Sequence, residues 1–142
     1  MTPTRIILHH SLTQDSGTVS WGAIRRYHTT QNGWKDIGYH FGIELVWEHY
    51  EVLMGRMFNE VGAHTAGQNN NSVGICFVGN FDLASPAPAL WKVGVKLVKS
   101  LTNVFGIPAS EIHAHNEYAQ KSCTGKMFDM KRFVLDVLKT GI

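Results

Sequence analysis

The chain has 142 residues, of which 44% are hydrophobic and 17% are charged, and its formal net charge is +2 at pH 7. This composition excludes a disordered chain, and no apolar run reaches the roughly 18 residues of a membrane-spanning helix. The small net charge does not indicate nucleic-acid binding. We therefore expect one soluble domain over residues 1–142, a monomer with neither membrane insertion nor a nucleic-acid partner.

The first predicted strand is the apolar run at residues 6–8, which ends in the adjacent histidines His9 and His10. Apolar β-branched residues followed by polar ones are typical of a buried strand whose end presents side chains to a site. A helix is predicted over residues 20–31, because Ser20 can cap its first turn and an Asn-Gly pair stops it.

Residues 37–47 and 51–55 predict an antiparallel pair of strands, but the connection lacks an Asn-Gly or Asp-Gly turn, which leaves the register open. The near-continuous apolar run at residues 73–78 predicts a central strand. A long helix is expected over residues 87–105, where apolar positions recur at helical spacing. Residues 112–115 predict a short last strand.

The closing helix is predicted over residues 128–138, and Trp47 and Trp91 are predicted to pack in the core or against a helix. Val104 belongs to the predicted apolar face of the preceding helix. Strands and helices interleave along the chain, which is typical of a layered domain. The predicted fold class is therefore α/β, a single domain with a central mixed β-sheet flanked by about three helices.

Cys76 and Cys123 are the two cysteines of the chain. The N-terminus lacks an apolar segment long enough for a signal peptide, so we expect synthesis in the cytoplasm and free thiols. Cys76 lies in an apolar run, where cysteine behaves as a small hydrophobe. Cys123 lies beside Lys121 and Lys126, which favours the thiolate.

His115, Lys121 and Cys123 lie within nine residues of one another and form the most informative stretch of the sequence. Imidazole and thiolate are ligands that zinc favours, and two of them on one loop can converge on one ion. His9 or His10 can supply a third ligand, but successive strand residues face opposite ways, so only one of them can. Three protein ligands leave one position open, as in catalytic zinc sites.

Five motifs, in order along nearly the whole chain, are shared with a known family. They are Ile7-Leu-His-His-Ser11, Tyr27-His28 followed by Gly33-Trp-Lys-Asp-Ile-Gly-Tyr-His-Phe41, Gly62-Ala-His-Thr-Ala-Gly67, Asn71-Ser-Val-Gly-Ile75, and His115 to Cys123. On these motifs the chain resembles the zinc-dependent N-acetylmuramoyl-L-alanine amidases of the phage T7 lysozyme, AmpD and peptidoglycan-recognition-protein group.

The resemblance implies one zinc ion per chain, with His9, His115 and Cys123 as ligands. It places Tyr39 and Lys121 in catalytic positions. Lys121 would stabilise the oxyanion that develops during amide hydrolysis, and Tyr39 would orient the water.

The same resemblance implies a substrate groove, and Glu117 is the nearest carboxylate if a general base exists. His10 would then be structural or would orient a ligand through its other ring nitrogen. The groove residues that the resemblance implies are His28, Trp34, His64, Thr65 and Asn71.

The chain departs from the family pattern at two places. Trp47-Glu-His-Tyr-Glu51 stands where many relatives have an Asp-Gly turn, and Cys123-Thr124-Gly125 stands where many have Cys-Pro. Without that proline, a rigid φ angle near the metal site is lost. We expect other contacts to hold the Cys123 loop.

The implied activity is hydrolysis of the amide between N-acetylmuramic acid and L-alanine in peptidoglycan, causing cell-wall lysis. A short chain of this kind resembles a phage or prophage endolysin, made in the cytoplasm and acting on the wall after release. One alternative is a cytosolic amidase that recycles soluble muropeptides. The other is a peptidoglycan-binding module without catalysis, although all three implied metal ligands are present.

Overall fold

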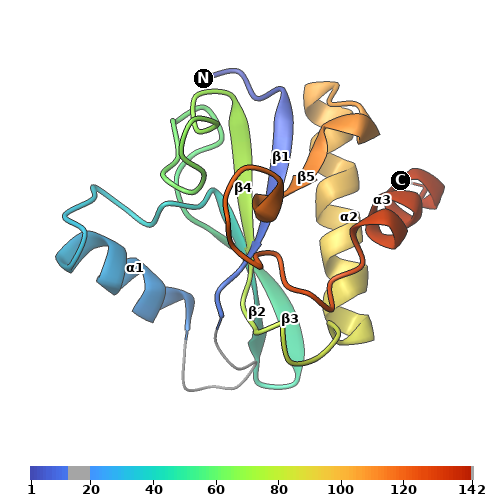
Figure 1. Cartoon of the computed structure of the whole chain (residues 1–142), viewed down its shortest axis with the longest axis horizontal. Coiled ribbons are helices and arrows are strands. Elements are labelled where there is room, and N and C mark those ends of the chain that lie inside the picture. Colours follow the sequence, from blue (N-terminus) through green and yellow to red (C-terminus); the bar gives the residue numbers. More distant parts are fainter. Residues whose placement is uncertain (13–19, 142) are drawn as a thin grey trace.

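The computed structural model describes residues 1–12 and 20–141. Five strands form one sheet in the order β3-β2-β4-β1-β5, with α2 and α3 on one face and α1 on the other (Figure 1). This architecture confirms the predicted α/β fold. The elements in chain order are β1 (Arg5–His10), α1 (Trp21–Thr30), β2 (Phe41–Val46), β3 (His49–Met54), β4 (Ser72–Phe77), α2 (Pro88–Phe105), the 3-10 turn η1 (Ala109–Glu111), β5 (Ile112–Ala114), the 3-10 turn η2 (His115–Glu117) and α3 (Met130–Lys139).

The sheet is mixed, as predicted. β1 pairs in parallel with β4 and β5, β2 pairs in parallel with β4, and β2 and β3 form the antiparallel hairpin. Parallel strands are covered on both faces, which explains why the sequences of β1 and β4 read as nearly continuous apolar runs. The parallel register sets His9 beside Cys76. Because neighbouring residues in a strand alternate between faces, His9 and His10 point to opposite sides of the sheet.

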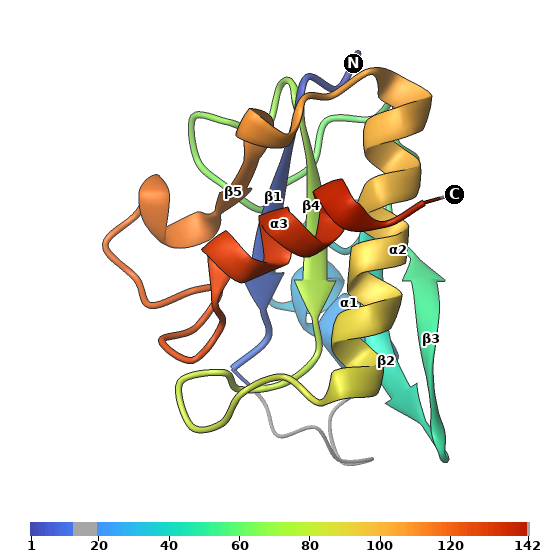
Figure 2. The same cartoon turned by 90° about the vertical axis from the view of Figure 1, so that its right-hand side faces the viewer.

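The larger core lies between the sheet and the pair α2 and α3, and Figure 2 shows both helices in front of the strands. It is built around Phe77, Phe128 and Phe133, whose rings pack edge to face or tilted at 5.3–6.0 Å. Trp91 packs on Phe133 at 5.1 Å, which confirms its predicted packing role. A smaller cluster of Trp21, Ile37 and Cys76 fills the α1 face. Within the described residues, none of the helices has the length and apolarity to cross a bilayer.

The helix ends follow the capping residues of the sequence. The Ser20 side chain accepts a hydrogen bond from the Ala23 N–H and starts α1, as predicted. At the end of α2, Gly106 takes a left-handed conformation with φ of 66°, which a glycine adopts without steric cost. α3 begins two residues later than predicted because the Asp129 side chain, not a residue before Phe128, caps the helix.

The hairpin differs from the prediction at both ends. β2 begins at Phe41, because the backbone of Gly38 and Tyr39 bonds to the 55–63 segment instead of continuing the β2 and β3 ladder. Val46 pairs with His49, so the turn has two residues, and Trp47 occupies it with φ of 60°.

The predicted packing of Trp47 is wrong, since its side chain stands at the tip of the turn and is 92% exposed. Val104 is also 74% exposed, because it lies off the buried side of α2, whereas the next residue, Phe105, still packs against the core. Both side chains are apolar but exposed, and sequence periodicity alone does not show which apolar residues reach the core.

Gly94→Ala in α2 should lower the free energy of unfolding by about 1–3 kcal/mol, although alanine normally favours a helix. A Cβ at this position would lie 2.5 Å from a ring carbon of Phe77, so the aromatic core has to shift. Gly22→Ala in α1 is the matched control, because the nearest heavy atom to its Cβ is 3.7 Å away. Urea unfolding should show Gly22→Ala unchanged or more stable by up to about 1 kcal/mol; equal effects of the two substitutions would contradict this packing.

Candidate metal centre

Three side chains from different segments converge at the carboxyl end of β1. His9 comes from the end of β1, His115 begins η2 directly after β5, and Cys123 lies in the loop before α3. One ligand atom from each lies within 4.8 Å of the other two. His9 and Cys123 are buried and His115 is half-buried. The structure therefore brings together the three residues that the sequence analysis selected as metal ligands.

The ring of His9 is oriented by a chain of buried hydrogen bonds. His9 Nε2 lies 3.0 Å from Nδ1 of His64, and Nε2 of His64 lies 3.3 Å from Ser72 Oγ. The Ser72 hydroxyl donates its only proton to the Gln68 carbonyl at 2.6 Å, so Ser72 Oγ must accept from His64. His64 Nδ1 then accepts from His9. These proton assignments leave the lone pair on His9 Nδ1, which faces Cys123 Sγ at 3.8 Å.

His64 and Thr65 lie behind His9 and are only 8% and 2% exposed. The ring of His64 occupies space that a side chain at residue 74 would fill, because a Cβ on Gly74 would come within 2.5 Å of it. The Asn69 side chain accepts hydrogen bonds from the backbone N–H groups of both His64 and Thr65. Their contribution to a substrate groove remains a prediction, and the contacts support a role in holding His9.

The Cys123 loop is held by contacts that replace the missing proline. The Thr124 hydroxyl donates to the Leu8 carbonyl at 2.6 Å, and the Asn116 N–H donates to the Cys123 carbonyl at 2.5 Å. The His10 backbone N–H donates to Cys123 Sγ at 3.3 Å. A hydroxyl at position 124 thus ties the loop directly to β1.

Asp82 is the second anchor of this loop, and no motif or spacing in the sequence indicates this role. Its carboxylate accepts from the Ser122 hydroxyl at 2.6 Å and from the Lys126 N–H at 2.9 Å. These hydrogen bonds, the one from Ser122 first, hold the pKa of Asp82 below its usual range. The Met127 N–H also donates to the Phe81 carbonyl at 2.7 Å, so two backbone segments run side by side here.

Two further sequence candidates lie outside the cluster of ligand atoms. The ring of His10 stacks on Phe81, and its Nδ1 accepts from the Phe81 N–H, so His10 contacts Cys123 only through its backbone. Glu117 accepts a hydrogen bond from the Ala114 N–H at 2.6 Å and contacts His113 Nδ1 at 3.1 Å. Both Glu117 oxygens are therefore engaged in shaping the turn that carries His115.

Tyr39 and Lys121 are the two predicted catalytic residues. Tyr39 lies just before β2, and Lys121 lies in the loop between η2 and α3. The Tyr39 ring lies 5.1 Å from the His9 ring, and burial raises the pKa of its hydroxyl well above 10, so the phenol keeps its proton. Burial is the largest influence on the pKa values of His9, His115 and Cys123, and the exposed Lys121 adds a smaller lowering effect at each. The field of its ammonium group therefore reaches all three ligand side chains.

His28, Trp34 and Tyr39 form a row of neighbouring rings, which we call the aromatic wall. The His28 ring lies 4.8 Å from Trp34 and 5.8 Å from Tyr39, and His28 Nδ1 accepts from the Gly38 N–H. A cavity of about 310 Å³ opens beside His28 and Tyr39. Asn71 instead lies just before β4, at the opposite end of that strand, where its carbonyl accepts from Thr4.

The protonation states of the three ligand residues fit a zinc-type cation. Burial lowers the pKa of His9 well below 6.5 and also lowers that of His115, so both imidazoles are neutral and can bind a metal. Burial raises the pKa of the Cys123 thiol to about 11, more than Lys121 lowers it. Lys121 therefore favours the Cys123 thiolate, as expected, but burial outweighs its effect in the absence of a bound cation. A metal ion bound by Cys123 would have to stabilise the thiolate, as zinc does.

An open site with three such ligands at the carboxyl edge of a mixed sheet is the arrangement of a metal-dependent hydrolase. The family model for N-acetylmuramoyl-L-alanine amidase matches residues 1–126. The chain belongs to this family and is an enzyme of the amidase class.

Individual relatives agree with this assignment. The chain is 35% identical to the endolysin of Escherichia phage T7 over 133 residues, which cover 90% of this chain and 83% of the relative. Among solved structures, the amidase endolysin LysCS from Clostridium intestinale aligns with a TM-score of 0.84 and 26% identity over 98% of this chain and 86% of the other. A Drosophila PGRP-LB variant in complex with tracheal cytotoxin aligns at 0.75 and 26% identity, covering 90% and 79%.

His64→Ala should weaken zinc binding about 10- to 100-fold, because it removes the acceptor that orients His9. Zinc affinity can be measured by competition with a chromogenic chelator. His49→Ala is the matched control, since His49 is exposed on β3 and pairs with Glu51. If His64→Ala bound zinc as tightly as the control, the orienting role would be refuted.

Zinc affinity should rise about tenfold per pH unit between pH 7 and 9. In this window His9 and His115 are already neutral and Cys123, with a pKa of about 11, is still protonated, so zinc binding releases one proton. Raising the pH removes that proton more easily and strengthens binding. The slope of log affinity against pH measures the number of protons released, and a slope near zero would show that Cys123 is not the ligand that loses a proton.

Proposed function

We propose that the chain is a zinc-dependent amidase that hydrolyses the bond between the lactyl group of N-acetylmuramic acid and L-alanine in peptidoglycan. The observation that carries this proposal is the convergence of His9, His115 and Cys123 within 4.8 Å. Two neutral imidazoles and one thiolate would hold a zinc ion through three protein ligands, and such a donor set would leave a position for water or substrate, as catalytic zinc requires. Family membership supplies the substrate class.

A zinc ion bound to these ligands supplies Lewis acidity towards the hydrolytic water and the scissile carbonyl. Protein side chains would orient the water and stabilise the developing charge. Tyr39 keeps its proton at neutral pH and can donate a hydrogen bond to orient the water or the carbonyl. Lys121 holds a positive charge near the ligands, where it can stabilise the oxyanion more than the neutral ground state. The half-buried position of His115 keeps one side of the centre open to substrate.

We propose that the sugar-peptide substrate lies along the wall of His28, Trp34 and Tyr39. The His28 ring packs between those of Trp34 and Tyr39, and His28 and Tyr39 border the cavity beside α1. Aromatic faces pack against apolar sugar and peptide surfaces, while imidazole and phenol groups hydrogen-bond carbonyl and hydroxyl groups. By family resemblance we also propose groove roles for His64, Thr65 and Asn71, of which His64 acts mainly through His9 and Asn71 lies at the opposite end of β4 from the metal ligands.

The role that we propose is that of a cell-wall lytic endolysin, because the matched relatives include endolysins of four phages. Such a protein would be made in the cytoplasm, would act as a monomer, and would reach the wall after release. A muropeptide-recycling amidase would instead prefer small soluble fragments. Loss of turbidity of purified walls, compared with turnover of a soluble muropeptide, separates the two roles.

The activity is tested by digesting a defined peptidoglycan and identifying the products by mass spectrometry. The expected products carry a free lactyl carboxylate on the sugar and a new L-alanine N-terminus on the peptide. Chelation should abolish cleavage and added zinc should restore it. Binding of peptidoglycan without zinc-dependent cleavage would overturn the proposal in favour of a non-catalytic module.

Lys121→Ala should retain zinc but lower kcat about 10²- to 10³-fold, because it removes transition-state stabilisation only. Cys123→Ala should lose zinc itself, because it removes a ligand. Lys126→Ala is the control for charge, since Lys126 lies on the same loop and is exposed. Metal analysis and kinetics of the three variants check both roles, and a fully zinc-loaded Cys123→Ala would contradict the ligand assignment.

A further inference from the structure

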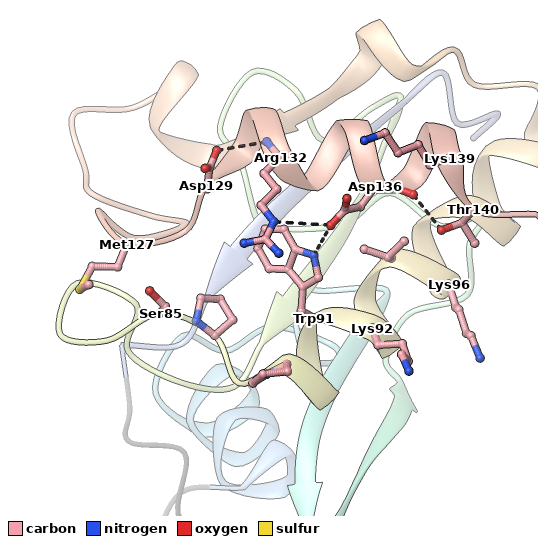
Figure 3. A pocket seen from close by; sticks show the side chains of 13 residues that line it. Ser85, Trp91, Lys92, Lys96, Met127, Asp129, Arg132, Asp136, Lys139 and Thr140 are labelled. Atoms are coloured by element: carbon pink, nitrogen blue, oxygen red, sulfur yellow. Dashed lines mark hydrogen bonds and ion pairs between the residues drawn. The ribbon is translucent and has the colours of Figure 1, made fainter.

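A second cavity, of about 590 Å³, lies between α2 and α3, away from the metal centre (Figure 3). Its apolar lining includes Pro86, Pro88 and Val95, and Trp91 lines it from α2. α2 and α3 cover the face of the sheet opposite to α1, whereas the ring of His9 packs against Tyr39 and His64 on the α1 side. The cavity is therefore separate from the proposed amide-cleaving site.

Positive charge gathers around this cavity. Four of the 13 lysines and arginines of the chain line it, although the net charge of the whole chain is only +2. Lys92 and Lys96 are one turn apart on α2, and Arg132 and Lys139 are two turns apart on α3. In the described part of the chain, none of the three ammonium groups has a hydrogen-bond or ion-pair partner. These cations are therefore available to a ligand.

The two carboxylates in the lining already have partners inside the protein. Asp129 accepts from the Arg132 N–H and caps α3. Asp136 accepts from the Trp91 indole N–H at 2.8 Å and lies 3.9 Å from the Arg132 guanidinium. Figure 3 shows Arg132 over the ring of Trp91, at 5.8 Å from its centroid. The carboxylates thus fix the positions of Trp91 and Arg132, and they do not neutralise the lysines.

We propose that this cavity is a second binding site, for short peptides that carry carboxylates. Guanidinium and ammonium groups pair with carboxylates, and the two helices present them on both sides of one groove. Pro86, Pro88 and Val95 offer apolar walls for small aliphatic side chains between the charges. A peptide of alternating small apolar and acidic residues satisfies both features.

The stem peptides of peptidoglycan have this chemistry, because they combine alanine with free carboxylates. Their identification as the ligand rests on the proposed function. The two sites lie on different faces, so one enzyme molecule can hold one strand of the wall through the second site while it cleaves a neighbouring strand. Contact through both sites would raise the effective concentration of the enzyme at the polymer. It would not change the affinity for a soluble fragment, which can occupy only one site at a time.

The direct test is a titration followed by amide chemical shifts of the ¹⁵N-labelled protein. The probe is a synthetic stem tetrapeptide, L-Ala-γ-D-Glu-L-Lys-D-Ala, and the control is its fully amidated form, which keeps both amino groups but has no carboxylate. We expect the free acid to shift residues 88–96 and 127–140 and the amidated form to leave them unchanged. Equal shifts with both peptides, or with inorganic phosphate at the same concentration, would overturn the proposal.

Charge variants locate the site. Lys92→Gln with Lys96→Gln should raise the dissociation constant of the tetrapeptide about five- to tenfold, because it removes two ligand-facing charges. Lys99→Gln with Lys131→Gln is the matched control, since it removes two charges from the same helices outside the cavity. Equal affinity of the two double variants would refute the assignment.

Activity assays separate this inference from the proposed function. The Lys92 and Lys96 double variant should cleave a soluble muropeptide at the wild-type rate but bind purified sacculi less tightly than the Lys99 and Lys131 control. If sacculus binding were equal in the two double variants, the wall-tethering role would be wrong. If no muropeptide were cleaved by any form while the tetrapeptide shifts remained, the amidase proposal would fail and the second site would stand.

Discussion

The parallel pairing of β1 with β4 and β5 is the constraint on which the rest of the structure depends. It brings the carboxyl end of β1 next to the start of η2, so that His9 and His115 meet although they are distant in sequence. The alternation of side chains then sends His9 towards α1 and leaves the other face to the aromatic core. A slip of one residue would exchange the two faces and turn His9 away from the other two metal ligands.

Buried polar groups surround the centre, and each needs a partner because unpaired polar groups are costly in the interior. The chain from His9 through His64 to Ser72 meets this requirement and fixes which nitrogen of His9 holds a lone pair. In the Cys123 loop, Thr124 and Asp82 form the hydrogen bonds that hold the backbone in place. The centre is thus supported by side chains that bind no metal, and this support limits how far the ligands can move.

The predictions that agree with the structure rest on local signals. Ser20 capped a helix because its side chain can reach a backbone N–H three residues on, and the apolar run of β4 indicated a strand buried on both faces. The predicted packing of Trp47 was wrong, and the predicted effect of Lys121 on the Cys123 thiol is outweighed by burial, for a shared reason. The exposure of a side chain and its loss of contact with water depend on neighbours that are distant in sequence. For the Cys123 pKa, the effect of burial by these neighbours is larger than the effect of the nearby Lys121.

By itself, the sequence determined the α/β fold class, the order of the elements, and the residue types able to form an open metal site, because helix caps, apolar periodicity and ligand chemistry are local properties. Only the tertiary structure decided that His64 supports His9, that Asp82 anchors the Cys123 loop, and that four cations gather between α2 and α3. These contacts join segments separated by tens of residues, and their geometry arises from strand register and helix packing, which no local pattern specifies.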